Sequence, residues 1–174
     1  MDEVTMKQEN KRAVCMVGTL VPIDWFQELQ SHAKVKAAPS PLFLQKMIFR
    51  ALHDEGEDVT CYGYPPVASF PGTPIVGFGM SEKNIDENLR VTVLPVLNLP
   101  LLKQISVFFS FLFALLFWEI RNIRKDRYIL VYADFLEYCC PALLINRIFH
   151  SHSILYLTEM PGLEHFHTGK VTLK

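Results

Sequence analysis

The last third of the chain alternates between strand-like and helix-like segments, and this order restricts the fold more than any other feature. The runs YILVYAD (Tyr128–Asp134) and SILYLTEMPG (Ser153–Gly162) predict two buried strands. Between them, PALLINRIF (Pro141–Phe149) predicts a helix with its proline in the first turn. A helix that joins two strands in this way makes them parallel, and parallel sheets bind ligands at the carboxyl ends of their strands. Asp134 and Glu159 stand at these two ends and are therefore candidate binding residues.

The same alternation is found earlier in the chain. Short apolar runs predict further strands, and apolar residues at spacings of three and four predict helices. Proline-rich and polar stretches between them predict loops and turns. The strands are Arg12–Val17, Asp58–Tyr64 and Leu89–Leu94, with an extended piece at Ile75–Gly79; the helices are Leu42–His53 and Gln104–Trp118; Pro65–Pro74 is a loop and Ser81–Asn88 a turn. Together they predict an α/β fold, with a mostly parallel sheet and helices on both faces.

Composition and charge restrict the classes of partner. The 174 residues suffice for one domain with a core, which we expect at residues 12–174 after a polar tail at residues 1–11. A net charge of -1 argues against a broad nucleic-acid surface. The N-terminus lacks the basic start and apolar core of a signal peptide, and four cysteines without metal or redox spacing fit reduced thiols. We therefore expect a cytoplasmic protein without a metal site.

One segment raises the question of membrane contact. Gln104–Trp118 (QISVFFSFLFALLFW) has no charged residue and lies between Lys103 and Glu119. A membrane span needs about 20 apolar residues, so this shorter run favours a helix packed against the sheet; the alternative is a small membrane protein anchored by this segment. A basic cluster follows it: Arg121, Arg124, Lys125 and Arg127. These cations either stabilise the negative end of the helix or contact an anionic membrane surface at the inner face of the membrane.

Five blocks occur in order along the chain. They are AVCMVG at Ala13–Gly18, the helix Pro41–His53 leading to Asp58, VLPVLNLP at Val93–Pro100, YILVYAD at Tyr128–Asp134 and LYLTEMPG at Leu155–Gly162. In this order they resemble the N-terminal domain of the retaining glycosyltransferases of the GT-B fold, of the group 1 or family 4 type. The resemblance covers nearly the whole chain and implies a Rossmann-like sheet that forms one half of a GT-B architecture.

The resemblance also implies a function. In such enzymes two Rossmann-like domains face each other across a cleft; the N-terminal domain mostly holds the acceptor, and the C-terminal domain holds the nucleotide-sugar donor. Nothing in the chain matches that second domain. The chain is therefore expected to be the acceptor-side domain of an enzyme that moves a sugar from a nucleotide-sugar to a glycan or lipid-linked acceptor. It would need a C-terminal domain or subunit as partner, no further cofactor, and would show little activity alone. The alternative is a non-catalytic interaction module that pairs with a separate catalytic subunit or a membrane surface.

Four residues are cleft candidates. Gly18 and Thr19 follow the first strand, where the resemblance implies a glycine-bearing loop near the donor phosphates; the stretch is not GxGxxG, and a simple turn explains it equally well. Asp134 either binds acceptor hydroxyls, acts as a base, or caps a helix. Glu159, just before Pro161-Gly162, either lines the cleft or lies in an exposed turn.

Overall fold

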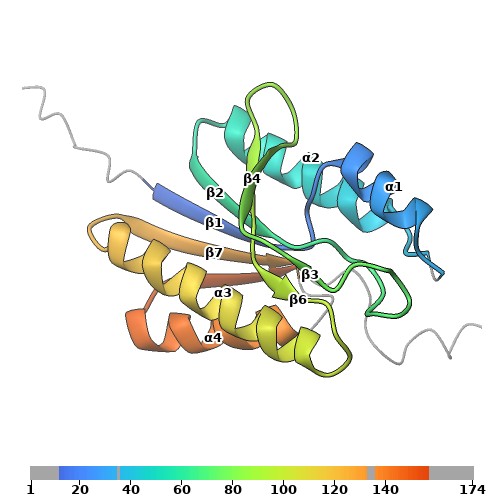
Figure 1. Ribbon diagram of the computed structural model, residues 1–174. Helices are drawn as coiled ribbons and strands as arrows, with labels where there is room; N and C mark the ends of the chain where they lie inside the picture. The colour runs from blue at the N-terminus through green and yellow to red at the C-terminus, as the bar shows by residue number, and fades with distance from the viewer. Residues whose placement is uncertain (1–11, 35, 133–135, 157–174) are drawn as a thin grey trace, which may run out of the picture.

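The molecule is built on one central sheet. The computed structural model describes residues 12–34, 36–132 and 136–156. Six strands form the sheet in the order β4-β5-β2-β1-β7-β8 (Figure 1). They are β1 (Arg12–Gly18), β2 (Asp58–Gly63), β4 (Ser81–Asn84), β5 (Arg90–Val93), β7 (Asp126–Tyr132) and β8 (His152–Tyr156). All neighbouring strands are parallel except β4, which is antiparallel to β5. This arrangement confirms the predicted α/β fold with a mostly parallel, Rossmann-like sheet.

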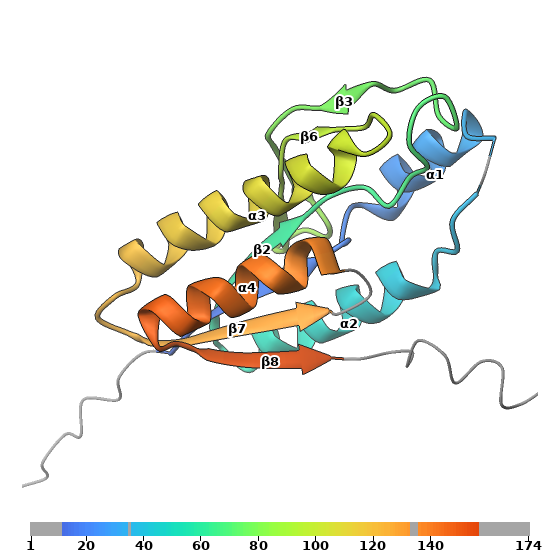
Figure 2. The same cartoon turned by 90° about the horizontal axis from the view of Figure 1, so that it is seen from below.

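Helices cover both faces of the sheet. α1 (Ile23–Ser31) and α2 (Ser40–Asp54) lie on one face, and α3 (Leu102–Arg121) and α4 (Leu136–Phe149) lie on the other (Figures 1 and 2). Each face has its own apolar core: Phe26, Leu42 and Phe49 are buried on the first, and Phe111, Leu115 and Ile145 on the second. A two-stranded antiparallel ribbon, β3 (Gly77–Phe78) with β6 (Val96–Leu97), lies beside α3. The helix pairs therefore form separate layers around a common sheet.

The strand order reverses at β1. From β1 the chain continues to its neighbour β2 and then to β5, whereas β7 pairs with the other side of β1 and leads outward to β8. β1 is buried from its second residue to its last, as expected for a central parallel strand with helices on both faces. In open α/β sheets the crevice for a ligand lies at this reversal, beyond the carboxyl ends of the strands.

Four local predictions were wrong. The strand predicted as buried at the end of the chain, β8, lies at the edge of the described sheet, and its Ile154, Leu155 and Tyr156 are exposed. A helix, α1, lies where none was predicted, and its buried residues Phe26, Leu29 and Gln30 follow helical spacing. The predicted turn Ser81–Asn88 begins with strand β4; its alternation of exposed and half-buried residues shows why this edge strand is polar. α4 begins at Leu136, so Pro141 lies inside the helix and not in its first turn. Because a proline lacks N–H, it leaves one carbonyl of the preceding turn without its usual donor.

The predicted helices Leu42–His53 and Gln104–Trp118 are confirmed and extend slightly further at both ends, as α2 and α3. Among the described residues, α3 alone is long and apolar enough to cross a membrane, and only 28% of its most apolar window is buried. Its inner face nevertheless packs on the sheet: Val107, Phe111 and Leu115 are at most 1% exposed. α3 is thus a surface helix with an unusually apolar outer side.

Candidate functional site

A pocket of about 360 Å³ opens at the carboxyl ends of the parallel strands. We call it the carboxyl-edge pocket. Its walls come from the segment that follows β2, from the loop between α1 and α2, and from the first turns of α3 and α4. The pocket is lined by Lys36, Ala37, Tyr64, Pro66, Val67, Ala68, Ser69, Lys103, Gln104, Val107 and Glu137. It therefore occupies the place where the strand order reverses, and its volume suits a small ligand.

Lys103 is the cation of this pocket. It lies in the first turn of α3, and its ammonium group donates a hydrogen bond to the carbonyl of Val67. The same nitrogen lies 5.9 Å from the centroid of the Tyr64 ring. Burial lowers the pKa of Lys103, and the carboxylate of Glu137 opposes this effect. A lysine has three N–H donors, so those not used by Val67 can bind hydroxyl or anionic groups of a ligand.

Glu137 supplies the opposite charge. It stands in the first turn of α4, where the partial positive charge of a helix start favours a carboxylate. It is half-buried and lines the same pocket as Lys103. The pair offers donors and acceptors within one pocket beside the aromatic ring of Tyr64. Such a combination can hold a ligand that has both hydroxyl groups and an apolar face.

Asn98 fixes the loop that forms one wall. The residue is fully buried, and its Nδ2 lies 3.1 Å from the carbonyl of Ala68, 3.0 Å from Oγ1 of Thr73 and 2.9 Å from the carbonyl of Ile75. Its backbone carbonyl also accepts a hydrogen bond of 2.8 Å from the N–H of Phe70. The proline-rich loop after β2 is therefore held by the asparagine of the VLPVLNLP block. Asn98 shapes the pocket without lining it.

Gly18 and Thr19 are packed against α2. The amide oxygen of Gln45 accepts a hydrogen bond of 2.9 Å from the N–H of Thr19, and the Gln45 amide nitrogen donates one of 2.9 Å to the Thr19 hydroxyl. A Cβ at Gly18 would lie 2.3 Å from that amide oxygen. Gly63, the register partner of Gly18, would bring a Cβ to 2.1 Å from the carbonyl oxygen of Leu20. Both glycines thus permit close approach at the strand ends, and the space beside Gly18 and Thr19 is filled by Gln45.

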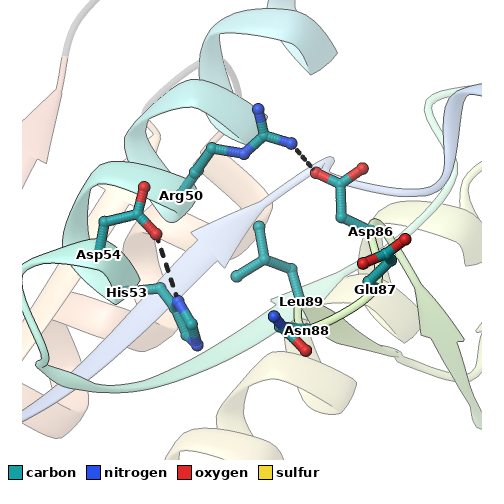
Figure 3. A pocket seen from close by; sticks show the side chains of 7 residues that line it. All are labelled: Arg50, His53, Asp54, Asp86, Glu87, Asn88 and Leu89. Carbon is teal, nitrogen blue, oxygen red and sulfur yellow. Dashed lines mark hydrogen bonds and ion pairs between the residues drawn. The ribbon is translucent and has the colours of Figure 1, made fainter.

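A second hollow, of about 340 Å³, lies where the C-terminal end of α2 meets the turn between β4 and β5 (Figure 3). It is far more polar, but its Arg50 guanidinium is already paired with the Asp86 carboxylate. Asp86 binds Lys46 at 2.9 Å and also binds Arg50, and His53 lies 3.5 Å from Asp54. The hydrogen bond from Lys46 is the main reason why the pKa of Asp86 is lowered. The carboxyl-edge pocket, where donors remain, is the stronger candidate site.

Two of the four predicted cleft residues, Asp134 and Glu159, lie outside the described residues, so their roles stay predictions. The structure brings the other two, Gly18 and Thr19, together with Gln45. Sequence reasoning missed Gln45 and Asn98, and it noted Lys103 only as the boundary of an apolar run. The available signal was that Lys103 and Glu137 each begin a helix that follows a strand, which places them at the carboxyl edge of the sheet.

Within residues 12–34, 36–132 and 136–156, no group of three or more His, Cys, Asp or Glu residues is placed to hold a metal ion. Burial raises the pKa of the Cys15 and Cys61 thiols, which keeps both in the unreactive protonated form.

No family model, no curated protein and no solved structure matches this chain.

Proposed function

We propose that this chain is the acceptor-side domain of a glycosyltransferase. The observation that carries the proposal is the carboxyl-edge pocket, in which Lys103, Glu137 and the ring of Tyr64 come together at the reversal of the strand order. A sugar presents hydroxyl groups at its edges and C–H groups on its faces. Charged donors and acceptors match the first, and the half-buried apolar side chains of Ala37, Pro66 and Ala68 in the lining match the second.

In this proposal the pocket orients an acceptor hydroxyl. Glu137 accepts its hydrogen bond, and Lys103 donates to a neighbouring hydroxyl. During transfer the acceptor oxygen bonds to the anomeric carbon of the donor sugar, the bond from that carbon to the nucleotide phosphate breaks, and the proton of the acceptor hydroxyl passes to the leaving phosphate. The nucleotide-sugar would be held by a C-terminal domain or a separate subunit, so the chain alone binds an acceptor and transfers little or no sugar.

Saccharide binding tests the proposal. We expect saturation-transfer NMR with a panel of methyl hexosides and disaccharides to show weak binding, in the millimolar range typical of a small, open site. Lys103→Met should abolish it and Glu137→Gln should weaken it, because the first removes the donor and the second replaces a charged acceptor by a neutral amide oxygen. The matched controls are Lys34→Met and Glu28→Gln, which lie outside the pocket. Binding that survives both pocket variants, or a panel in which nothing binds, contradicts the proposal.

The second candidate is an interaction module that pairs with a separate catalytic subunit. Among the described residues β8 is an edge strand, and its Ile154, Leu155 and Tyr156 are all exposed. An exposed apolar edge strand is a template for pairing with another chain. Hydrogen exchange at β8 that slows on addition of a donor-domain chain, and does not slow in Ile154→Lys, would favour this function. Unchanged exchange would count against it.

A further inference from the structure

The outer side of α3 carries a continuous apolar stripe. Ile105, Phe109, Phe113 and Phe117 are four residues apart, so they lie above one another on the helix, and each is between 48% and 70% exposed. The rings of Phe109 and Phe113 stack with centroids 6.3 Å apart. A surface helix of a soluble domain usually carries polar side chains at such positions. We call these four residues the α3 stripe.

The apolar surface is wider than the helix. A groove of about 570 Å³ lies beside the stripe, between α3 and the segments that carry β3 and β6. Met80 and Leu97 line its far side, opposite Phe109 and Phe113, and both are more than half exposed. Exposed apolar patches that extend over several elements mark contact with a protein or a membrane.

The groove offers almost no hydrogen-bonding groups to a partner. Its two serines are already engaged: Ser106 donates to the carbonyl of Lys103 at 2.9 Å and accepts from the N–H of Leu97 at 3.0 Å, and Ser110 donates to the carbonyl of Pro95 at 2.5 Å. Protein interfaces carry about one hydrogen bond per 100–200 Å². Acyl chains need none, so this chemistry favours a lipid over a protein.

The stripe ends on positive charge. Arg121 follows Phe117 by one further turn, and Arg124 comes three residues later. Within the described part of the chain neither arginine forms an ion pair, whereas Lys125 binds Asp58 at 2.5 Å and Arg127 binds Glu119 at 2.6 Å. The nearest exposed carboxylate along the chain is Asp126, at the start of β7. The balance favours an anionic surface, to which each arginine contributes about 1 kcal/mol.

The helix can lie on such a surface but not cross it. Its inner residues Val107, Phe111 and Leu115 belong to the core of the sheet. Glu119, two residues before the end of α3, is fully buried in its ion pair with Arg127. Spanning the bilayer would expose this core and break that pair, whereas lying in the interface plane needs only the outer face.

We propose that the α3 stripe, with the adjoining groove and with Arg121 and Arg124, docks the protein onto an anionic phospholipid surface. The phenylalanines enter the boundary between head groups and acyl chains, and the arginines bind lipid phosphates. This contact does not depend on the proposed function. It would hold the carboxyl-edge pocket, at the opposite end of α3, close to the membrane.

Vesicle co-sedimentation of the full chain tests the proposal. We expect binding to vesicles of phosphatidylcholine with phosphatidylglycerol, and weaker binding to phosphatidylcholine alone. Phe113→Glu should lower the affinity at least about tenfold, because it places a charge in the apolar layer. Arg121→Gln and Arg124→Gln should each lower it about fivefold on the anionic vesicles, and little on the neutral ones. Circular dichroism checks that each variant is folded.

Met47→Glu is the matched control. Met47 is 68% exposed on α2, so the substitution adds the same charge at an exposed apolar site on the opposite face. Vesicle binding should be unchanged. An equal loss in Met47→Glu and Phe113→Glu would overturn the proposal, since charge and not position would then explain it. The proposal would also be overturned if the chain bound no vesicles but self-associated in analytical ultracentrifugation, and if Phe113→Glu removed that self-association. A second copy of the chain would then be the occupant of the stripe. Resistance of the membrane-bound chain to alkaline extraction would overturn the interfacial geometry in favour of a span.

Discussion

The helices on the two faces of the sheet differ in which charged and apolar side chains they bury and which they expose. On α2 the charged residues lie outside, where Lys46 and Arg50 pair with Asp86, and the polar residue turned inward is the neutral Gln45. On α3 the carboxylate of Glu119 is fully buried against Arg127, while phenylalanines lie outside. The outer side of α2 thus carries charged groups beside the exposed Phe43 and Met47. The outer side of α3 carries the α3 stripe, with no charged residue between Gln104 and Trp118.

The largest effect is expected where that buried pair is broken. Arg127→Met leaves the carboxylate of Glu119 buried without its cation and removes the donor to the carbonyl of Phe149, 3.1 Å away. Removing one partner of a buried pair costs about 3–5 kcal/mol. Urea unfolding followed by circular dichroism should show a loss of this size.

The double variant Glu119→Gln, Arg127→Met separates charge from shape. Because it removes the unpaired charge, it should recover part of the stability that Arg127→Met loses. If Arg127→Met lowered the free energy of unfolding by less than about 1 kcal/mol, the pair would contribute no more than a solvent-exposed ion pair does. The buried pair of α3 would then not differ from the exposed pairs of α2.

A smaller effect is expected from the neutral polar contact under α2. Gln45→Leu deprives both the N–H and the hydroxyl of Thr19 of their partners. A buried polar group left unsatisfied costs about 1–3 kcal/mol, so the free energy of unfolding should fall by about 2 kcal/mol. Gln27→Leu, at an exposed position of α1, is the control and should change stability by less than about 0.5 kcal/mol. Equal effects in the two variants would show that Gln45 does not hold the end of β1.

Much of the fold could be predicted because its central elements have strong local patterns. β1 is a nearly continuous apolar run, and α3 contains a run without charge at Gln104–Trp118, so both were predicted as elements that pack in the core. β1 is buried as predicted, whereas only the inner side of α3 is. The errors fall where the pattern is weak or ambiguous. β4 is polar because it is an edge strand, and Pro141 has the preferences of a helix start although α4 begins earlier.

The candidate site was predicted less well. The rule that ligands bind at the carboxyl ends of parallel strands indicated the edge of the sheet at which the carboxyl-edge pocket lies, but it does not say which residues turn inward there. Tyr64, Lys103 and Glu137 are separated by more than thirty residues in each interval, and only the parallel topology brings them together. Gln45 lies 26 residues from Thr19 and fills the space beside Gly18. Long-range contacts of this kind leave no trace in local spacing.

The smallest effect is expected at the exposed ion pairs of α2. Asp86 is 30% exposed, and its hydrogen bonds with Lys46 and Arg50 lower its pKa. A lowered pKa means that the folded state binds the proton less readily than the unfolded chain. The stabilisation is therefore present above the ordinary aspartate pKa of about 3.9 and is lost as the pH falls toward the lowered value. Asp86→Asn should lower Tm by no more than about 2 °C at neutral pH, and the difference from the natural chain should shrink in acid.

The salt dependence of Tm distinguishes the exposed ion pairs of α2 from the buried ion pair of α3. High salt screens exposed charges and acts far less on buried ones. The effect of Asp86→Asn on Tm should therefore disappear in concentrated sodium chloride, whereas the effect of Arg127→Met should persist. If the two variants responded to salt alike, Glu119 and Arg127 would have to be reached by solvent. That result would remove the contrast between the exposed charges of α2 and the buried ion pair of α3.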